Sequence, residues 1–404
     1  MAPRHPTTVA SVASLPDGTE VRLDGRVVSV DSEGIVLWDA TGTLPVRGTS
    51  APLGAWVSVE ASVLGGRLTR VAFQVHSSPR RPFPSPDGDF QRLQSRGGLR
   101  ARNLVRRARA HRAVREFFDG RDYLEVETPT VVPSPGLDVH LAAFEVRGGP
   151  VTGYLGTSPE YQMKRLLAGG LPRIYQIGRC YRRDEAGRNH EPEFTMVEWY
   201  RAFASADALM DETEALVRHV VRALNDGSSI VRRGGRSLDV GVTWERLTVD
   251  EAFRRYADVS MFDVLPDEER FYRLLIERIE PVLGQDRPVF LHRWPASMAS
   301  LARLAPDDPR VAERFEAYVG GLELCNGFGE LTDPIEQRAR FEADRAAREE
   351  LGLDVYPVDE RFLAALEEGM PPAAGNALGF DRLVMLATSS ESLEDVLAVP
   401  SSRL

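Results

Sequence analysis

Residues 176–203 read QIGRCYRRDEAGRNHEPEFTMVEWYRAF, and this stretch is the most informative part of the chain. Strand-like runs at 175–183 and 193–201 flank a polar loop, which predicts a β-hairpin. Alternation along the second strand puts four side chains on one face: Phe194, Met196, Glu198 and Tyr200. Arg182, beside Asp184, adds a guanidinium just before the turn. Such a hairpin can bind a nucleoside triphosphate together with an amino acid; the simpler alternative is a half-buried hairpin with a solvated charged loop.

The composition is that of a globular enzyme with more than one domain. The chain has 404 residues, of which 43% are hydrophobic and 27% are charged. Its formal net charge of −10 argues against general binding of polyanions, so any contact with nucleic acid must come from a local patch. Cys180 and Cys325 are the only cysteines, and they show no metal-ligand spacing, which argues against a disulfide framework or a zinc site.

The chain contains no long apolar run and almost no lysine. The N-terminal residues MAPRHPTTVASVASLPDG hold no apolar run long enough for a signal peptide, and no 18-residue apolar run follows. We therefore expect a cytoplasmic protein without membrane contact. Lys164 is the only lysine among the 50 lysine and arginine residues, which we attribute to genome composition.

Residues 1–78 are predicted to form a small all-β domain. The expected strands lie between Asp/Gly and Pro/Gly turns, at 21–30, 34–40, 43–48, 55–64 and 67–76. This arrangement resembles an OB-fold barrel. An OB-fold that reads RNA needs a basic groove and stacking aromatics, whereas here the charges nearly balance and the aromatics are Trp38, Trp56 and Phe73. Both RNA binding and a structural role therefore stay open.

The remainder of the chain is predicted to be a linker at 79–98, rich in Pro, Gly and Ser, and a catalytic domain at 99–404. In the catalytic domain, strand patterns are interrupted by helices expected at 99–118, 206–224 and 334–351. This mixture favours an α+β fold with an antiparallel sheet over a doubly wound one. The first helix carries seven arginines, which form either a solvated face or a docking surface for an acidic macromolecule.

The hairpin resembles motif 2 of the class II aminoacyl-tRNA synthetases, in their lysine branch. It resembles still more the ligases that attach lysine or β-lysine to elongation factor P. Other segments match in family order: RDYLEVETPTVVPSPGLDVH (121–140, motif 1), TSPEYQMKRLL (157–167), PASMASLARL (295–304), ERFEAYVGGLELCNGFGELTD (313–333) and GMPPAAGNALGFDRLVMLA (369–387). The resemblance covers residues 99–404 and implies a class II catalytic domain, preceded here by the OB-like domain.

The resemblance also implies a site for ATP and magnesium. Formation of an acyl-adenylate requires charge neutralisation at the α-phosphate and at the departing pyrophosphate, and arginine suits both tasks. By resemblance, Arg182 contacts the α-phosphate and Arg382 the γ-phosphate, and both are expected to be catalytic. Other positions implied for the nucleotide are Phe194 for stacking on adenine, Asp184 in place of a family glutamate, the loop histidine His190, and Gly379, whose backbone lies close to the nucleotide. Glu316 and Glu323 match the pair that holds magnesium.

For the amino acid, the family pattern implies a pocket for a cationic side chain. Glu330 and Tyr200 match the end that binds the ε-ammonium, and Asn326 matches the contact to the carboxylate. Glu160 and Glu198 match the end that binds the α-amino group. Simple alternation would put Glu323 and Glu330 on opposite faces of one strand, so we expect a β-bulge near Gly327.

Cys325 stands where lysyl-tRNA synthetases carry glycine and the elongation factor P ligases carry alanine. Its side chain is expected to reshape the floor of the amino-acid pocket and to favour the protein ligases. The alternative is a small buried apolar residue.

These observations predict an ATP-dependent ligase that activates lysine or (R)-β-lysine and transfers it to a lysine of elongation factor P. The first alternative is a lysyl-tRNA synthetase or another tRNA-acting relative, and the second is a non-catalytic regulator that binds amino acid or RNA. The resemblance further implies a homodimer formed through motif 1, around residues 121–135.

Overall fold

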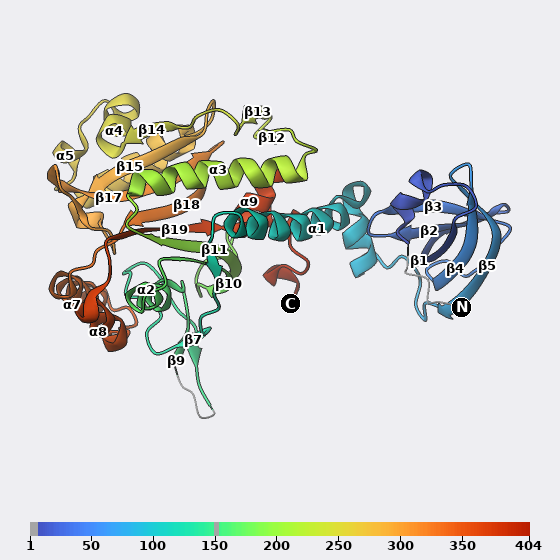
Figure 1. Ribbon diagram of the computed structural model, residues 1–404, viewed down its shortest axis with the longest axis horizontal. Helices are drawn as coiled ribbons and strands as arrows, with labels where there is room; N and C mark the ends of the chain where they lie inside the picture. The colour runs from blue at the N-terminus through green and yellow to red at the C-terminus, as the bar shows by residue number, and fades with distance from the viewer. Residues whose placement is uncertain (1–6, 149–152) are drawn as a thin grey trace. The chain divides into compact units, whose positions relative to one another are not determined.

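The computed structural model describes residues 7–148 and 153–404 (Figure 1). The chain separates into two units, Met1–Arg106 and Arg107–Leu404, called here the N-terminal and C-terminal units. The prediction that no signal peptide is present rests on residues 1–18, and residues 1–6 of these lie outside the described residues. Within the described ranges, none of the helices has both the length and the apolar character needed to cross a bilayer.

The N-terminal unit is built on a five-stranded antiparallel sheet, with the strands in the order β3-β2-β1-β4-β5. Its strands are β1 (Glu20–Val30), β2 (Gly34–Asp39), β3 (Gly42–Arg47), β4 (Trp56–Leu64) and β5 (Arg67–Ser77). Alternate residues of β1, among them Val21, Leu23 and Val27, are buried in an apolar core. The prediction of five strands is confirmed, with ends that differ by at most one residue.

Helix α1 (Asp89–Asp119) begins inside the stretch predicted to be a linker. It is interrupted by non-helical backbone at Ser95–Gly98, where Arg96, Gly97 and Gly98 adopt positive φ angles. The predicted helix at 99–118 therefore corresponds to the part of α1 after this kink.

The C-terminal unit contains the remaining elements (Figure 1). Its strands are β6 (Leu124–Glu125), β7 (Val131–Val132), β8 (Glu145–Val146), β9 (Gly153–Leu155), β10 (Arg173–Tyr181), β11 (Glu193–Ala202), β12 (Ile230–Arg233), β13 (Arg236–Asp239), β14 (Glu245–Thr248), β15 (Val289–Pro295), β16 (Leu304–Ala305), β17 (Asp308–Val319), β18 (Leu322–Gly329) and β19 (Ala373–Gly379). Its helices are α2 (Glu160–Ala168), α3 (Ala206–Leu224), α4 (Val249–Ala257), α5 (Met261–Val264), α6 (Glu268–Leu274), α7 (Pro334–Glu350), α8 (Glu360–Gly369) and α9 (Phe380–Ala387).

A nine-stranded sheet organises the described part of this unit, in the order β14-β15-β17-β18-β19-β11-β10-β6, with β16 paired to β17. The α+β prediction is confirmed. The central strands are antiparallel as expected, but β6 pairs with β10, and β14 with β15, in parallel, so the sheet is mixed.

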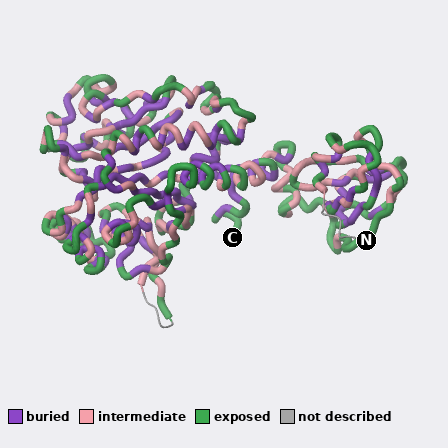
Figure 2. Tube along the Cα trace, in the orientation of Figure 1, coloured by how far each residue is buried: buried purple, intermediate pink, exposed green. Residues whose placement is uncertain are grey.

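The two faces of the central strands have different roles. Helix α3, predicted at 206–224 and found there, lies along one face and packs against β17, β18 and β19 (Figure 1). Trp199, Leu378 and Phe315 are buried in the core with this helix, and the purple colour in Figure 2 follows these strands. On β11, β17 and β18, the side chains that alternate with these core residues face the other side of the sheet, where the site described below lies.

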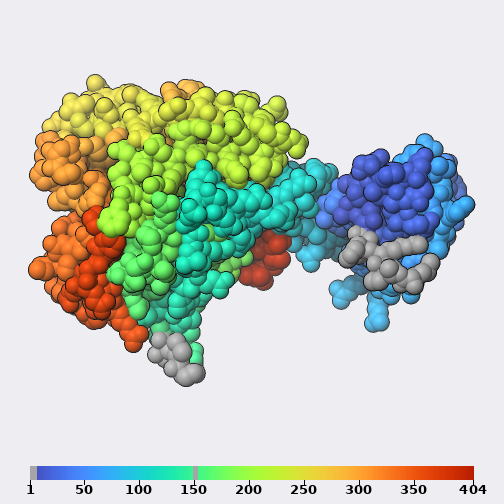
Figure 3. Space-filling model, viewed as in Figure 1, coloured from blue at the N-terminus to red at the C-terminus, as the bar shows by residue number. Residues whose placement is uncertain are grey.

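Helices α7 and α8 complete that other side at one end of the sheet. Helix α8 packs against α2, and their surfaces adjoin in the space-filling view (Figure 3). Tyr200 of β11 lies in the same apolar cluster as Tyr161 of α2, Phe341 of α7 and Phe362 of α8. This packing brings the predicted amino-acid residues of α2 and β11 together.

Candidate active site

A cavity of about 260 Å³ lies between the β10–β11 hairpin, strand β18 and the start of α9. Six predicted ATP-site residues line it: Arg182, His190, Phe194, Glu323, Gly379 and Arg382. Asn326 and Cys325, predicted for the amino acid, line it as well. The sequence analysis did not single out Glu185, Asn189 or Asp381, which also contribute to the wall.

The hairpin has the predicted parity. Glu193–Ala202 pairs with Arg173–Tyr181, and Cys180 lies opposite Phe194. Strand β10 begins and ends two residues earlier than expected, although the Arg182 amide still donates to the Pro192 carbonyl at 2.9 Å. The Arg182 guanidinium lies 5.1 Å from the Phe194 ring centroid. A guanidinium and an aromatic ring are therefore presented to the cavity side by side.

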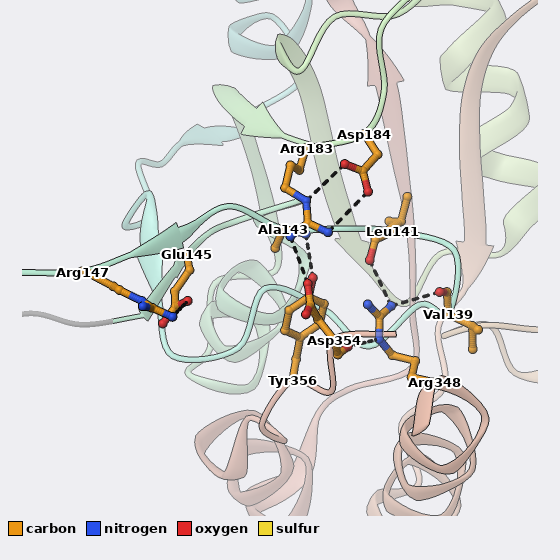
Figure 4. A network of polar contacts seen from close by, with 10 residues as sticks. All are labelled: Val139, Leu141, Ala143, Glu145, Arg147, Arg183, Asp184, Arg348, Asp354 and Tyr356. Carbon is orange, nitrogen blue, oxygen red and sulfur yellow. Dashed lines mark hydrogen bonds and ion pairs between the residues drawn. The ribbon is translucent and has the colours of Figure 1, made fainter. Parts of the chain in front are cut away.

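The prediction for Asp184 needs correction, because its carboxylate does not line the cavity. It is exposed and bonded to Arg183 at 3.1 Å (Figure 4). Glu185 takes the inner position and pairs with Arg182 at 3.2 Å. Simple alternation placed Asp184 with Arg182, but the chain has already left the strand at this point and turns.

The side chain of Arg183 continues a network behind the hairpin (Figure 4). It bonds Asp354 at 3.0 Å, and Tyr356, two residues further, accepts the amide proton of Ala143 at 2.8 Å. Arg348, buried at the end of α7, donates to the carbonyls of residues 138, 139, 141 and 354. This network fixes the segment after motif 1 against the turn that carries Arg182.

Arg382 is held at the start of α9, directly after β19. Its NH1 group lies 2.9 Å from the Glu323 carbonyl and 3.3 Å from the Glu323 carboxylate. Its NH2 group is 2.7 Å from Nε2 of His190. Burial, together with the charge of Arg382, lowers the pKa of His190, so the imidazole is neutral and can accept this hydrogen bond.

Asp381 joins the start of α9 to the hairpin. It accepts the Thr195 amide at 2.8 Å and pairs with Arg107 of α1 at 2.5 Å. Arg115 of the same helix pairs with Glu125 at 2.8 Å. At least two of the seven arginines of this helix thus bind to the C-terminal unit itself.

Glu316 and Glu323 lie on neighbouring strands, on the cavity side of the sheet. Tyr318 pairs with Glu323, and Ala317 pairs with Cys325, so Leu324 is the extra residue of a β-bulge. The predicted bulge exists, but at Leu324 rather than near Gly327. It places Glu323 on the same face as Asn326 and Glu330.

The surroundings of Glu316 are polar and buried. Arg314 bonds its carboxylate at 2.8 Å, and the Tyr318 hydroxyl donates to it at 2.7 Å. Burial raises the pKa of Glu316 to about 7, and the nearby Glu323 adds to this rise although Arg314 opposes it. Among residues 7–148 and 153–404, no cluster of three His, Cys, Asp or Glu side chains forms a metal site on its own. The pair fits magnesium, which typically takes one or two carboxylates and completes its shell with phosphate oxygens and water.

Asn326 is oriented by the same arginine. The Nε of Arg314 donates to Asn326 Oδ1 at 3.3 Å, which leaves the amide nitrogen of this cavity-lining side chain free of that contact. Sequence reasoning did not identify Arg314, because its role depends on two strands and not on a motif.

The four residues predicted for the amino groups of the substrate form one cluster, in which Glu198, Tyr200 and Glu330 are buried and Glu160 is partly exposed. The Tyr200 hydroxyl donates to Glu198 at 2.6 Å, and Ser158 donates to the same carboxylate at 2.9 Å. Burial, reinforced by the charge of Glu160, raises the pKa of Glu198 to about 8. Burial also raises the pKa of Glu330 to about 8, although Lys164 opposes the rise. Tyr200 was predicted beside Glu330; its hydroxyl instead bonds Glu198, while its ring lies near Glu330.

The side chain of Cys325 does not form the pocket floor, and this prediction needs correction. Cys325 lies opposite Ala317 and Leu378, both part of the core packed under α3. Its parity is opposite to that of Asn326, so the thiol points toward the core under α3, although the residue contributes to the cavity wall. Burial raises the pKa of this thiol, as expected for an inert core cysteine.

Comparisons with known proteins agree with this geometry. Residues 90–403 match the family model "tRNA synthetases class II (D, K and N)". Three relatives are each named elongation factor P--(R)-beta-lysine ligase. The protein of Hamiltonella defensa subsp. Acyrthosiphon pisum is 44% identical over 310 residues, that of Yersinia enterocolitica 46% over 314, and that of Proteus mirabilis 45% over 314. Each alignment covers 74% of this chain and 95% of the relative. The chain therefore belongs to the class II tRNA synthetase family and is an ATP-using, AMP-forming ligase of that type.

Proposed function

We propose that this protein activates (R)-β-lysine or lysine as an adenylate and transfers the aminoacyl group to a lysine side chain of elongation factor P. The observation that carries the proposal is a carboxylate cluster, with Glu198 and Glu330 buried and Glu160 partly exposed, on the same side of the sheet as a cavity lined by Arg182 and Arg382. A diamino acid suits this cluster because each ammonium group can pair with a desolvated carboxylate. The names and coverage of the relatives support the same substrate and acceptor.

In the first step, the carboxylate oxygen of the amino acid attacks the α-phosphorus of ATP. An oxygen–phosphorus bond forms, the bond to pyrophosphate breaks, and no side-chain nucleophile is needed. Arg182 is assigned to the α-phosphate and Arg382 to the γ-phosphate, where each neutralises charge that develops in the transition state. The Phe194 ring is assigned to the adenine, and its contact with Arg182 aligns the two groups.

Two ion pairs must rearrange when the nucleotide binds. Arg182 exchanges Glu185 for phosphate, and Arg382 loosens its contact with Glu323. Glu316 and Glu323 would then hold magnesium, which would supply further positive charge to the phosphate oxygens. In the second step, the acceptor amine attacks the carbonyl carbon of the adenylate, AMP leaves, and the amine gives up a proton to solvent.

Aminoacylation of tRNA is the second candidate. The family match begins at residue 90, so the five-stranded sheet of the N-terminal unit lies outside it and is available for another role. A non-catalytic regulator is disfavoured, because Arg182, Arg382, Glu316 and Glu323 are all present. A regulator would be free to lose them.

One experiment separates these candidates. The protein is incubated with ATP and labelled lysine or (R)-β-lysine, and elongation factor P and tRNA are offered separately. We expect label on elongation factor P and little on tRNA. Efficient charging of tRNA would favour the second candidate, and no pyrophosphate exchange with either amino acid would contradict both.

We also propose a homodimer formed through residues 121–135. The supporting observation is that β6 is an edge strand of the nine-stranded sheet and that Leu124 on it is half exposed. A cytoplasmic location stays a prediction.

A further inference from the structure

The only lysine of the chain lies inside the carboxylate cluster. Lys164 is on α2, one helical turn after Glu160, and its side chain is fully buried. Its Nζ atom is 2.6 Å from Glu160 Oε1 and 2.5 Å from Glu330 Oε2. A fully buried lysine bound by two carboxylates is uncommon, because burial of an ammonium costs several kcal/mol unless it is well paired.

This arrangement leaves one oxygen of Glu330 available. Glu330 Oε1 is buried and has no hydrogen-bond partner among the described residues. It faces the backbone of Gly375, where a Cβ atom would lie 2.5 Å from this oxygen and 2.3 Å from the Tyr200 ring. Glycine is therefore required at 375, and the free oxygen of Glu330 lies close to the Tyr200 ring.

The charges of the cluster do not balance without a ligand. With the carboxylates of Glu160, Glu198 and Glu330 ionised, Lys164 neutralises one and leaves a formal charge of −2, so the free protein holds protons in this cluster: burial raises the pKa of Glu198 and of Glu330 to about 8. Arg303 lies near Glu330, but it is bonded to Glu313 at 2.7 Å and is engaged there. The hydroxyls of Tyr200 and Ser158 add hydrogen bonds and no charge. Two ammonium groups on one ligand would complete the balance.

We propose that Lys164 is a positioning residue that fixes the Glu330 carboxylate for the distal ammonium of the substrate and sets the charge of the cluster for a diamino acid. This role rests on the proposed function and refines it. The lysine acts through Glu330 and Glu160 and need not touch the substrate. Without it, three carboxylates would share a buried space, and protons would be taken up in place of the missing cation.

The proposal can be tested with Lys164→Met, which keeps the length of the side chain and removes its charge. The assay is ATP–pyrophosphate exchange on the full-length protein, with lysine and with (R)-β-lysine. At about pH 7 we expect the KM for the amino acid to rise tenfold or more, because without the Lys164 charge the pKa of Glu330, already raised to about 8, rises further and the substrate must displace a more tightly held proton. The KM for ATP should stay within about twofold of the original, since the phosphate arginines are elsewhere.

The pH dependence distinguishes this role from a structural one. Removal of the Lys164 cation raises the pKa of Glu330 further, so the deficit should shrink as the pH rises to about 9. Damage to packing would not be repaired by alkaline pH. Arg165→Met is the matched control, because it removes a positive charge from the same helix without entering the cluster, and it should leave both KM values unchanged.

Three results would overturn the role of Lys164: an unchanged KM for the amino acid, an equal deficit at both pH values, or a comparable rise in the KM for ATP. If Lys164→Met does not fold, as judged by thermal melting, Lys164→Arg serves instead. It keeps the charge, so it should keep the original pH dependence of KM, and a shifted dependence would contradict the proposal. Absence of exchange in the unmodified protein would overturn the proposed function, and this role with it.

Discussion

Replacement of Arg182 by alanine tests the assignment of the phosphate site most directly. In the free protein Arg182 contributes little to stability, because its ion pair with Glu185 is about a quarter exposed on both sides. Such pairs contribute about 0–1 kcal/mol, and the contact with the Phe194 ring adds about 0.5–1 kcal/mol. In the transition state the same guanidinium would neutralise the α-phosphate, and loss of such a contact costs on the order of 100-fold or more in rate, or about 2.7 kcal/mol.

Arg183→Ala is the matched control for this experiment. It removes the same side chain one residue further, where the guanidinium is bonded to Asp184 and Asp354 outside the cavity (Figure 4). We expect pyrophosphate exchange to fall about 100-fold or more in Arg182→Ala and by no more than a few-fold in Arg183→Ala. Thermal melting should show that both variants remain folded. Normal exchange in Arg182→Ala, or equal losses in the two variants, would refute the assignment of Arg182.

Further outcomes are expected from the same site and from the units around it. Cys325→Gly should destabilise the protein by about 1–3 kcal/mol in thermal or urea unfolding, because it opens a void under α3. The ratio of kcat/KM for β-lysine and α-lysine should stay within about twofold. A large change in that ratio would restore the prediction that Cys325 forms the pocket floor. A protein that begins at Gly97, in the kink of α1, should still catalyse pyrophosphate exchange and remain a dimer in light scattering, and if elongation factor P is the acceptor, transfer to it should fall little. Because burial raises the pKa values of Glu198 and Glu330 to about 8, the folded form binds protons more tightly than the unfolded one. The free energy of unfolding should therefore fall as the pH rises from about 5 to about 8, and saturating lysine should reverse the fall. Melting curves with and without lysine check this. Burial alone would lower the pKa of Lys164, but its two carboxylate partners raise it, so the amine stays protonated and cannot attack the adenylate. The intact mass of the enzyme should therefore not increase on incubation with ATP and lysine. A mass adduct on Lys164 would contradict this.

The structure adds residues that sequence motifs did not indicate. Glu185 and Arg314 act on predicted site residues from neighbouring turns and strands, and Asp381 ties α9 to β11. For Lys164 a local signal existed: it follows Glu160 by four residues on a predicted family segment, a spacing that places the two side chains on one face of a helix. Its second partner, Glu330, is distant in the sequence and could not be inferred from that spacing.

The sequence alone was sufficient for the α+β class, the hairpin at 176–203 and the bounds of α3, because strand alternation and helical periodicity are properties of the local backbone. The family followed from the resemblance of its motifs, which stand in family order along the chain. It also identified eight of the seventeen residues that line the cavity, since they lie in segments that follow one another in family order. Only the tertiary structure decided which carboxylate meets Arg182, where the bulge in β18 lies and which way Cys325 points. The physical reason is that the ion-pair partners of a turn and the register of a strand depend on neighbours that are remote in the chain. A shift of one residue turns every later side chain to the opposite face.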